Sequence, residues 1–211
     1  MGAVTMSDAS IRQEIRITIR AGTGQFYTFN GLCDGREHFA VGFGDWRAQN
    51  APLVRVHSEC ATGDLFGSAR CDCGDQMQEA IDRMRVEGGV FLYLRQEGRG
   101  IGLYNKLDAY ALQQKGFDTY EANLMLDFPA DLRDYAPAVQ MLKALGLRRI
   151  RLLSNNPDKV SQLSAGGIEI EQAVPTRTYI KEENRAYLKA KLEKGNHRLF
   201  LQWGDYEYAP A

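Results

Sequence analysis

The sequence predicts a mixed α+β fold, with a β-rich N-terminal part followed by alternating helices and strands. Two observations support this prediction. Apolar and polar residues alternate over short segments before residue 58, and after residue 74 apolar residues recur at helical spacing between short apolar runs. The length of 211 residues and the hydrophobic content of 44% are sufficient for one sizeable core. We expect a single folded domain over residues 13–195, between a flexible N-terminal tail (1–12) and a C-terminal tail (196–211).

Four strands are predicted in the N-terminal part. Ile15, Ile17 and Ile19 alternate with polar residues, which is typical of a half-buried strand. The segment Gly22-Thr23-Gly24 predicts the turn into a returning strand, so these two strands form a hairpin. The predicted strands cover residues 15–20, 26–29, 38–43 and 53–57.

Helices and strands alternate in the second part of the chain. Met77, Ile81 and Met84 recur at helical spacing from Asp75, and Gly88 ends this helix. Asp131 is well placed as an N-cap of a later helix. Further helices are predicted over 101–114, 131–144, 157–163 and 182–194, and strands over 90–94, 150–153 and 168–174.

The bulk composition excludes several classes of protein. A net charge of −1 argues against binding nucleic acid by bulk electrostatics. No run of about 18 apolar residues is present, so we expect no transmembrane helix and no membrane partner. The N-terminal segment has no apolar stretch typical of a signal peptide. We therefore expect a cytoplasmic location, where clustered cysteines serve metals or catalysis more often than disulfides.

Three of the four cysteines, Cys60, Cys71 and Cys73, lie within one polar, glycine-containing stretch. Zinc in structural sites takes four protein ligands, whereas in catalytic sites it takes three and leaves the fourth position to water. The local count of three favours an open site. Two alternatives remain at this point: the thiols are simply buried and free, or Cys33 or His57 completes a closed structural site.

A polar strand precedes the cysteines. On a strand, Arg55, His57 and Glu59 share one face, next to the predicted metal. A solvated strand edge is the alternative explanation of this pattern.

A glycine-rich loop, Arg95 to Gly102, follows a buried strand and precedes a helix, where open α/β sheets place ligands. Backbone N–H groups at such a helix start suit phosphate, and Arg99 can bind phosphate oxygens with two hydrogen bonds. Glu97 can accept the paired N–H donors of a guanine edge. A simple connection remains the alternative for this loop.

Two later segments also carry polar groups. Asp131 and Asp134 are expected one helical turn apart with Arg133 between them, although a capped and solvated helix start explains the same pattern. Ser154 and Lys159 lie in a strand-to-helix loop that suits phosphate.

Together these segments resemble the GTP cyclohydrolase II family of riboflavin biosynthesis. The resemblance covers about residues 53–175, and it rests on RVHSEC-x(2)-GD, RCDCG, RQEGRGIGL-x-NK, AYALQ-x(2)-G-x-DT-x-EAN, D-x-RDY and LL-x-NNP-x-K. The resemblance implies that residues 13–195 form a catalytic domain of this type and that the protein is a homodimeric enzyme. This sequence differs from the usual pattern of the family at Gln114, Asp127 and Ser154, and again after Pro175.

The resemblance also implies roles for individual residues. It assigns one zinc ion to Cys60, Cys71 and Cys73, with water as the fourth ligand, and a magnesium ion to the triphosphate of GTP. It assigns catalysis to Tyr110, to Asp131 as proton acceptor and to Arg133. Its GTP-contacting residues fall on Arg55, Val56, His57, Ser58, Glu59, Gln76, Glu97, Gly98, Arg99, Thr119, Ser154 and Lys159.

In this family GTP loses pyrophosphate, and C8 of the purine leaves as formate. The product is 2,5-diamino-6-ribosylamino-4(3H)-pyrimidinone 5′-phosphate. The alternatives are a paralogue that opens the imidazole ring but retains the formyl group, a paralogue in a secondary-metabolite pathway, and a non-catalytic zinc-stabilised nucleotide-binding module.

Overall fold

The computed structural model of the chain describes residues 9–117, 125–126, 128, 131–185, 188–189, 201–203 and 206–208. The chain divides into two compact units, and each is built from segments that are distant in the sequence. The first unit comprises Met1–His57, Ala80–Arg95 and Asp134–Pro175, and the second comprises Ser58–Glu79, Gln96–Arg133 and Thr176–Ala211.

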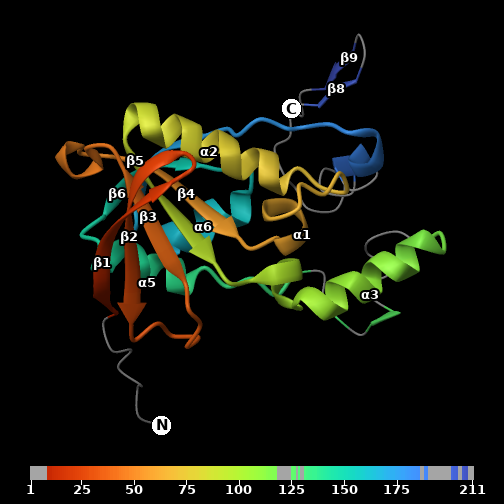
Figure 1. Cartoon of the computed structure of the whole chain (residues 1–211), viewed down its shortest axis with the longest axis horizontal. Helices are drawn as coiled ribbons and strands as arrows, with labels where there is room; N and C mark the ends of the chain where they lie inside the picture. The colour runs from red at the N-terminus through yellow and green to blue at the C-terminus, as the bar shows by residue number, and fades with distance from the viewer. Residues whose placement is uncertain are drawn as a thin grey trace. The chain divides into compact units, whose positions relative to one another are not determined.

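The first unit is built on a seven-stranded mixed sheet with the strand order β1-β2-β3-β5-β4-β6-β7. The first four strands in that order are joined by antiparallel pairs, whereas β4, β6 and β7 are joined by parallel pairs. The predicted mixed α/β class with a β-rich start is therefore confirmed (Figure 1). The strand bounds are β1 Ser10–Ile19, β2 Gly22–Asn30, β3 Phe39–Phe43, β4 Leu53–Ser58, β5 Gly89–Leu94, β6 Arg149–Leu153 and β7 Glu169–Val174.

The N-terminal hairpin is longer than predicted. Strand β1 begins at Ser10, inside the predicted tail, because Ser10 pairs with Asn30 of β2. The predicted turn at residues 22–24 is wrong, since Ile19 pairs with Gly22 and the turn consists of residues 20 and 21. Ile15 is 57% exposed, so β1 is a largely exposed edge strand rather than a half-buried one.

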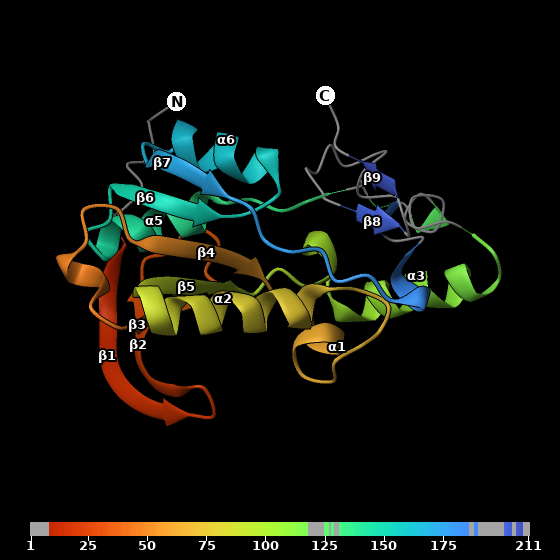
Figure 2. The same ribbon diagram turned by 90° about the horizontal axis from the view of Figure 1, so that it is seen from above.

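Helices of the first unit cover both faces of the sheet. Helix α5 (Ala136–Ala144) and helix α6 (Pro157–Ala165) lie on one face, and the second half of α2 (Cys73–Glu87) lies against the other (Figures 1 and 2). Strand β6, helix α6 and strand β7 form the predicted β-α-β unit. Two adjacent parallel strands need a crossover connection, which is usually a helix, and α6 is this connection between β6 and β7.

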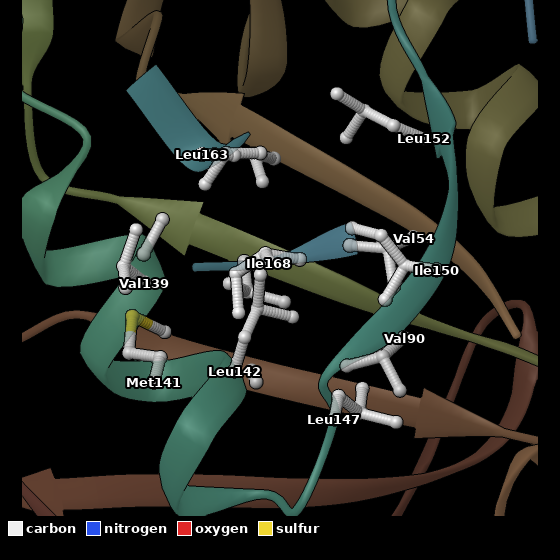
Figure 3. Close-up of a cluster of buried hydrophobic side chains, with 14 of the residues drawn as sticks. Val54, Val90, Val139, Met141, Leu142, Leu147, Ile150, Leu152, Leu163 and Ile168 are labelled. Carbon is white, nitrogen blue, oxygen red and sulfur yellow. The ribbon is translucent and has the colours of Figure 1, made fainter. Parts of the chain in front are cut away.

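The hydrophobic core of the first unit lies between the sheet and helix α5. Met141 and Leu142 of α5 are fully buried against side chains from β4, β5 and β6. Figure 3 shows these side chains converging on the space between helix and strands. Burial of a large aliphatic side chain contributes about 1.5–3 kcal/mol. The labelled members are Val54, Val90, Val139, Met141, Leu142, Leu147, Ile150, Leu152, Leu163 and Ile168.

Helix α5 begins later than predicted. The sequence predicts a helix from Asp131, but the helix begins at Ala136. Pro137 lies in its first turn, where the missing backbone N–H of proline leaves no helical hydrogen bond unmade, whereas in a helix that began at Asp131 the same proline would remove an internal hydrogen bond. Asp134 still stabilises this start, because its side chain accepts a hydrogen bond from the backbone N–H of Ala136 at 2.8 Å.

The second unit contains helix α1 (Ala61–Asp64), the first half of α2, helix α3 (Leu103–Gln114) and the two-stranded sheet of β8 (Leu201–Trp203) and β9 (Tyr206–Tyr208). Residues 182–184 form a short 3₁₀ turn, and most of the helix predicted over 182–194 lies outside the described residues. In the part of the chain that the structure describes, no helix has the length and hydropathy needed to cross a membrane.

His38 is a buried hydrogen-bonding residue of the first unit, just before β3. One ring nitrogen lies 2.8 Å from Asp34, and the other accepts a hydrogen bond from the backbone N–H of Arg95 at 2.9 Å. Burial lowers the pKa of His38 below its ordinary value of 6.5, and this effect outweighs the opposing effect of Asp34. The folded protein therefore binds fewer protons at this position than the unfolded chain does below about pH 6.5.

We expect His38 to make the protein less stable as the pH falls. The free energy of unfolding should decrease below pH 6.5 by up to about 1.4 kcal/mol per pH unit from this group. A His38→Gln variant should be less stable at pH 7.5, and its deficit should narrow toward pH 5.5. Denaturant unfolding of both proteins at several pH values measures this difference, and a deficit that stays constant over this range would contradict the assignment.

Candidate active site

Cys60, Cys71 and Cys73 come together in the second unit. Cys60 directly precedes α1, Cys71 lies in the loop before α2, and Cys73 is the first residue of α2. Their sulfur atoms all lie within 4.8 Å of one another, and Cys60 and Cys71 are 3.6 Å apart. Tetrahedral coordination with zinc–sulfur bonds of 2.3 Å places two sulfurs about 3.8 Å apart. The donor set therefore fits a zinc ion.

Two glycines make room for this cluster. A Cβ at Gly63 would lie 3.0 Å from the Cys71 sulfur and 3.1 Å from the Cys60 sulfur. A Cβ at Gly74 would collide with the carbonyl oxygen of Gly63. The two glycines thus allow α1 and the start of α2 to approach closely. Gly74 is the second residue of α2, and its role is this close approach.

The cluster has one strongly acidic thiol. Hydrogen bonds from Cys71 and Cys73, together with the charge of Lys106, hold the pKa of Cys60 well below its usual range despite burial. The hydrogen bond to Cys60 and burial raise the pKa of Cys71 to about 11, and the same causes raise that of Cys73. Three adjacent thiolates repel one another, so a bound cation is needed to ionise all three.

Lys106 of α3 was not assigned from the sequence, although it ends the motif RQEGRGIGL-x-NK. Its ammonium group lies 3.1 Å from the Cys60 sulfur, 2.9 Å from Glu97 and 3.0 Å from the Thr62 hydroxyl. Burial lowers the pKa of Lys106, but the negative charges of Cys60 and Glu97 raise it by more than burial lowers it. The pKa of Lys106 therefore lies above its ordinary value. Lys106 is therefore a charged neighbour of the cysteine cluster.

Tyr110 lies one helical turn after Lys106 on α3. The Arg70 guanidinium is 4.9 Å from the centre of its ring, and the Lys106 ammonium is 5.7 Å away. Burial and the charges of Cys71 and Cys60 outweigh the effect of Lys106, and they raise the pKa of Tyr110 to about 12. The hydroxyl therefore keeps its proton at neutral pH and is available as a donor.

Asp131 and Arg133 form a close ion pair at the end of the Gln96–Arg133 segment of the second unit. The Arg133 side chain donates to both carboxylate oxygens of Asp131, and the Arg133 backbone N–H donates to the same group at 3.0 Å. Burial raises the pKa of Asp131, but Arg133 lowers it more, so the net direction is downward. Because the helix begins only at Ala136, the two residues lie in the loop before it rather than on the helix.

The glycine-rich loop forms a strained turn. Gly98 and Arg99 both have left-handed backbone conformations, with φ near 61° and 60°. A non-glycine residue in this region is uncommon and is found at functional sites. The carbonyl oxygen of Arg99 accepts a hydrogen bond from the Leu132 N–H at 3.0 Å, which ties this loop to the Asp131 segment.

A second group of predicted residues lies in the first unit. Strand β4 is an interior strand, and its Arg55 and His57 are 6% and 3% exposed, so the alternative of a solvated strand edge is wrong. Arg55 donates to the Leu153 carbonyl at 3.1 Å, and Lys159 donates to the Val56 carbonyl at 2.6 Å. The parallel pairing of β4 with β6 brings these segments to the same edge, together with buried Ser154.

The remaining predicted residues are placed as follows. Ser58 has a buried hydroxyl without a hydrogen-bond partner among the described residues, which suits contact with a ligand or water. Gln76 is buried and donates to Asp72 at 2.6 Å. Glu59 follows β4 rather than extending its polar face. Thr119 lies outside the described residues, as does Asp127. Cys33 is exposed, and neither Cys33 nor His57 belongs to the cysteine cluster.

The profile of a known family, described as GTP cyclohydrolase II, matches residues 10–175. The chain belongs to the GTP cyclohydrolase II family. It is 52% identical over 196 residues to GTP cyclohydrolase-2 of Vibrio vulnificus, covering 92% of this chain and 99% of that protein. It is 50% identical over 194 residues to riboflavin biosynthesis protein RibBA of Bacillus cereus, covering 90% of this chain and 49% of that protein.

Among solved structures, RibBX, a two-domain 3,4-dihydroxy-2-butanone 4-phosphate synthase from A. baumannii, aligns with 82% of this chain and 41% of its own. The TM-score is 0.49 at 17% identity.

The segment after residue 175, beyond the family profile, holds the beginning of α2. Thr176 and the Arg177 N–H both donate to one carboxylate oxygen of Glu79, at 2.6 and 3.0 Å. Lys181 donates to Asp75 at 2.7 Å. These bonds fix the first two turns of the helix that begins with Cys73. The segment after residue 175 therefore supports the cysteine cluster of this chain.

We expect a Glu79→Gln variant to lose about 1 kcal/mol of unfolding free energy, because its uncharged amide oxygen accepts the two hydrogen bonds more weakly than the carboxylate oxygen does. Asp82→Asn, an exposed change on the same helix, is the matched control. Denaturant unfolding curves measure both, and equal stabilities of the two variants would contradict the role assigned to Glu79.

Proposed function

We propose that this member of the GTP cyclohydrolase II family hydrolyses GTP at C8 and releases formate and pyrophosphate. The product is 2,5-diamino-6-ribosylamino-4(3H)-pyrimidinone 5′-phosphate. Membership of the family and the 52% identity to GTP cyclohydrolase-2 of Vibrio vulnificus support an enzyme of this type. The single observation that carries the proposal is the group of three cysteines beside a neutral tyrosine.

Zinc is the proposed metal, held by Cys60, Cys71 and Cys73. The sulfur-rich donor set suits zinc, and among the described residues the cluster contains no fourth His, Cys, Asp or Glu ligand. When bound with an open position, zinc lowers the pKa of a coordinated water to about 7 and polarises nearby oxygens. The absence of a fourth ligand in the described part of the cluster favours this open site over a closed structural site.

Tyr110 is proposed as the donor at the reacting centre. Its phenol stays protonated at neutral pH because its pKa is raised to about 12. A protonated phenol can donate a hydrogen bond to the oxygen that develops negative charge as the purine ring opens at C8. Arg70 and Lys106 lie against its ring and hold its orientation.

Arg133 is proposed to bind the α-phosphate where pyrophosphate leaves. An arginine stays protonated in proteins, so we assign it electrostatic stabilisation rather than nucleophilic attack. Asp131, which donates no proton at neutral pH, orients this guanidinium and can accept a proton from the attacking group. Magnesium is proposed to accompany the triphosphate.

The polar residues predicted from the sequence are proposed to bind GTP as the substrate. Arg99 and Lys159 supply cationic groups suited to phosphate oxygens. Glu97 already accepts hydrogen bonds from the Ala61 and Gly98 N–H groups and from Lys106. Its carboxylate is thus committed to protein donors, and Gly98 and Arg99 are better suited to contact the nucleotide.

A homodimer, a cytoplasmic location and a catalytic domain that ends near residue 195 are part of the same proposal.

Product analysis tests the proposed reaction. The protein is incubated with GTP, zinc and magnesium, the product is identified by mass, and formate and pyrophosphate are quantified. Equal molar yields of formate and pyrophosphate are expected. Pyrophosphate without formate would show an enzyme that retains the formyl group, and bound GTP without either product would show a non-catalytic binding module.

A further inference from the structure

Lys106 is a buried cation with three partners in the second unit. It is 9% exposed, and its ammonium group has three N–H donors. The Cys60 sulfur, the Glu97 carboxylate and the Thr62 hydroxyl all lie within 3.1 Å of it. A buried ammonium is costly unless it is paired and hydrogen-bonded, and these three partners meet that requirement.

Glu97 holds this lysine in a fixed position. One carboxylate oxygen accepts from the Ala61 N–H at 2.6 Å, and the other accepts from the Gly98 N–H at 2.8 Å and from Lys106. Ala61 directly follows Cys60, so the same carboxylate fixes the backbone next to the metal ligand. The lysine and the cysteine are therefore both attached to one anchored group.

The charge of a loaded three-thiolate centre gives this arrangement a function. A divalent ion with three thiolates has a net charge of −1, and strong donation from thiolate sulfur weakens the metal as a Lewis acid. A hydrogen bond from an ammonium group to one sulfur reduces that donation and balances the charge. Partners of metal ligands tune metals in this way, and their loss changes metal affinity or activity by about 10–100-fold.

We propose that Lys106 is a positioning residue that donates a hydrogen bond to the Cys60 sulfur and balances the negative charge of the metal-loaded cysteine cluster. Glu97 is its anchor rather than a group that recognises guanine. This inference rests on the proposed function only in taking the three cysteines as metal ligands, and it does not depend on the substrate.

The main variant is Lys106→Met, which removes the charge and the donors but keeps the length of the side chain. It leaves Glu97 buried next to an apolar group, which can cost about 3–5 kcal/mol of stability. The double variant Lys106→Met with Glu97→Gln removes both charges and so the cost of the unpaired carboxylate, at the loss of one of the two backbone N–H hydrogen bonds to residue 97. Lys106→Arg restores the charge, and Lys115→Met, an exposed change at the end of the same helix, is the matched control.

Two measurements on the full chain are made without GTP. Zinc affinity is determined by competition with a chromogenic chelator, and the cobalt-loaded protein is characterised by its thiolate-to-metal charge-transfer absorption. Thermal unfolding of each metal-loaded variant confirms that it is folded.

The proposal predicts that zinc affinity falls roughly 10- to 100-fold in Lys106→Met and in the double variant, because the loss of the balancing positive charge outweighs the stronger donation from the sulfur. Lys106→Arg should recover much of this loss, and Lys115→Met should match the unchanged protein. The cobalt charge-transfer band should shift to longer wavelength without the lysine, because the sulfur becomes a stronger donor.

An unshifted band together with zinc affinity within about twofold of the unchanged protein, in either folded variant, would overturn the proposal. If metal binding depends on Lys106 but the protein does not turn over GTP, the proposed function is wrong and this inference still holds.

Discussion

Replacing Cys71 by Ser is expected to abolish metal binding and to reduce GTP turnover by about 1,000-fold or more. A metal of this kind contributes several kcal/mol of transition-state stabilisation, and each 1.36 kcal/mol corresponds to a tenfold change in rate. Cys71 lies 3.6 Å from the Cys60 sulfur in a loop before α2, so its loss leaves a centre with two sulfurs. A serine hydroxyl is a poor ligand for zinc at neutral pH.

Cys33→Ser is the matched control for this variant. Cys33 is exposed and lies outside the cysteine cluster, so its substitution should leave zinc content and formate release unchanged. Zinc per chain is measured by elemental analysis, and formate by an enzymatic assay. Normal formate release from metal-free Cys71→Ser protein would contradict the metal site, and loss of zinc in Cys33→Ser would show that Cys33 is a ligand.

Replacing Tyr110 by Phe is expected to lower kcat by about 10²–10⁴-fold, which is the usual contribution of a positioned proton donor. The phenylalanine ring keeps its contacts with Arg70 and Lys106, so zinc content and KM should change little. Tyr104→Phe is the control, because Tyr104 lies on the same helix and is 83% exposed.

The pH profile gives an independent test of the role of Tyr110. Because the pKa of Tyr110 is raised to about 12, the donor should remain protonated across the neutral and mildly alkaline range. Activity that depends on Tyr110 should therefore show no decline from its ionisation until the pH approaches 12. A Tyr110→Phe variant with unchanged kcat would contradict its role as donor.

The cysteine cluster could be predicted from the sequence because its residues are close together and chemically distinctive. Cys71 and Cys73 are separated by one residue, and Cys60 precedes them in the same glycine-containing stretch. The position of β5 could likewise be predicted, because this interior strand is a short apolar run. These features depend on local patterns, which sequence analysis recovers well.

The role of Lys106 could not be predicted in the same way. It lies 46 residues after Cys60, and its burial depends on Glu97 and Thr62 being brought to the same place by the fold. A lysine on a helix is ordinarily expected to be exposed. The only indication in the sequence was the position of Lys106 in the motif RQEGRGIGL-x-NK, and the motif does not show which residues Lys106 contacts.

The start of α5 was mispredicted because two local signals conflicted. Asp131 is a good N-cap residue by type, but Pro137 is better placed at the beginning of the helix. As a consequence, the loop conformation lets Asp131 pair with Arg133 two residues later. A continuous helix would place these side chains on different sides.

The most direct test of the proposed function is the release of formate during zinc titration of the metal-free protein, with GTP and magnesium in excess. The proposed reaction predicts a rate that rises in proportion to bound zinc and reaches a plateau at one zinc ion per chain. Formate and pyrophosphate should be released in equal amounts throughout. Full-rate formate release by protein without metal, or no formate release at full zinc occupancy, would contradict a catalytic three-cysteine zinc centre that acts on GTP.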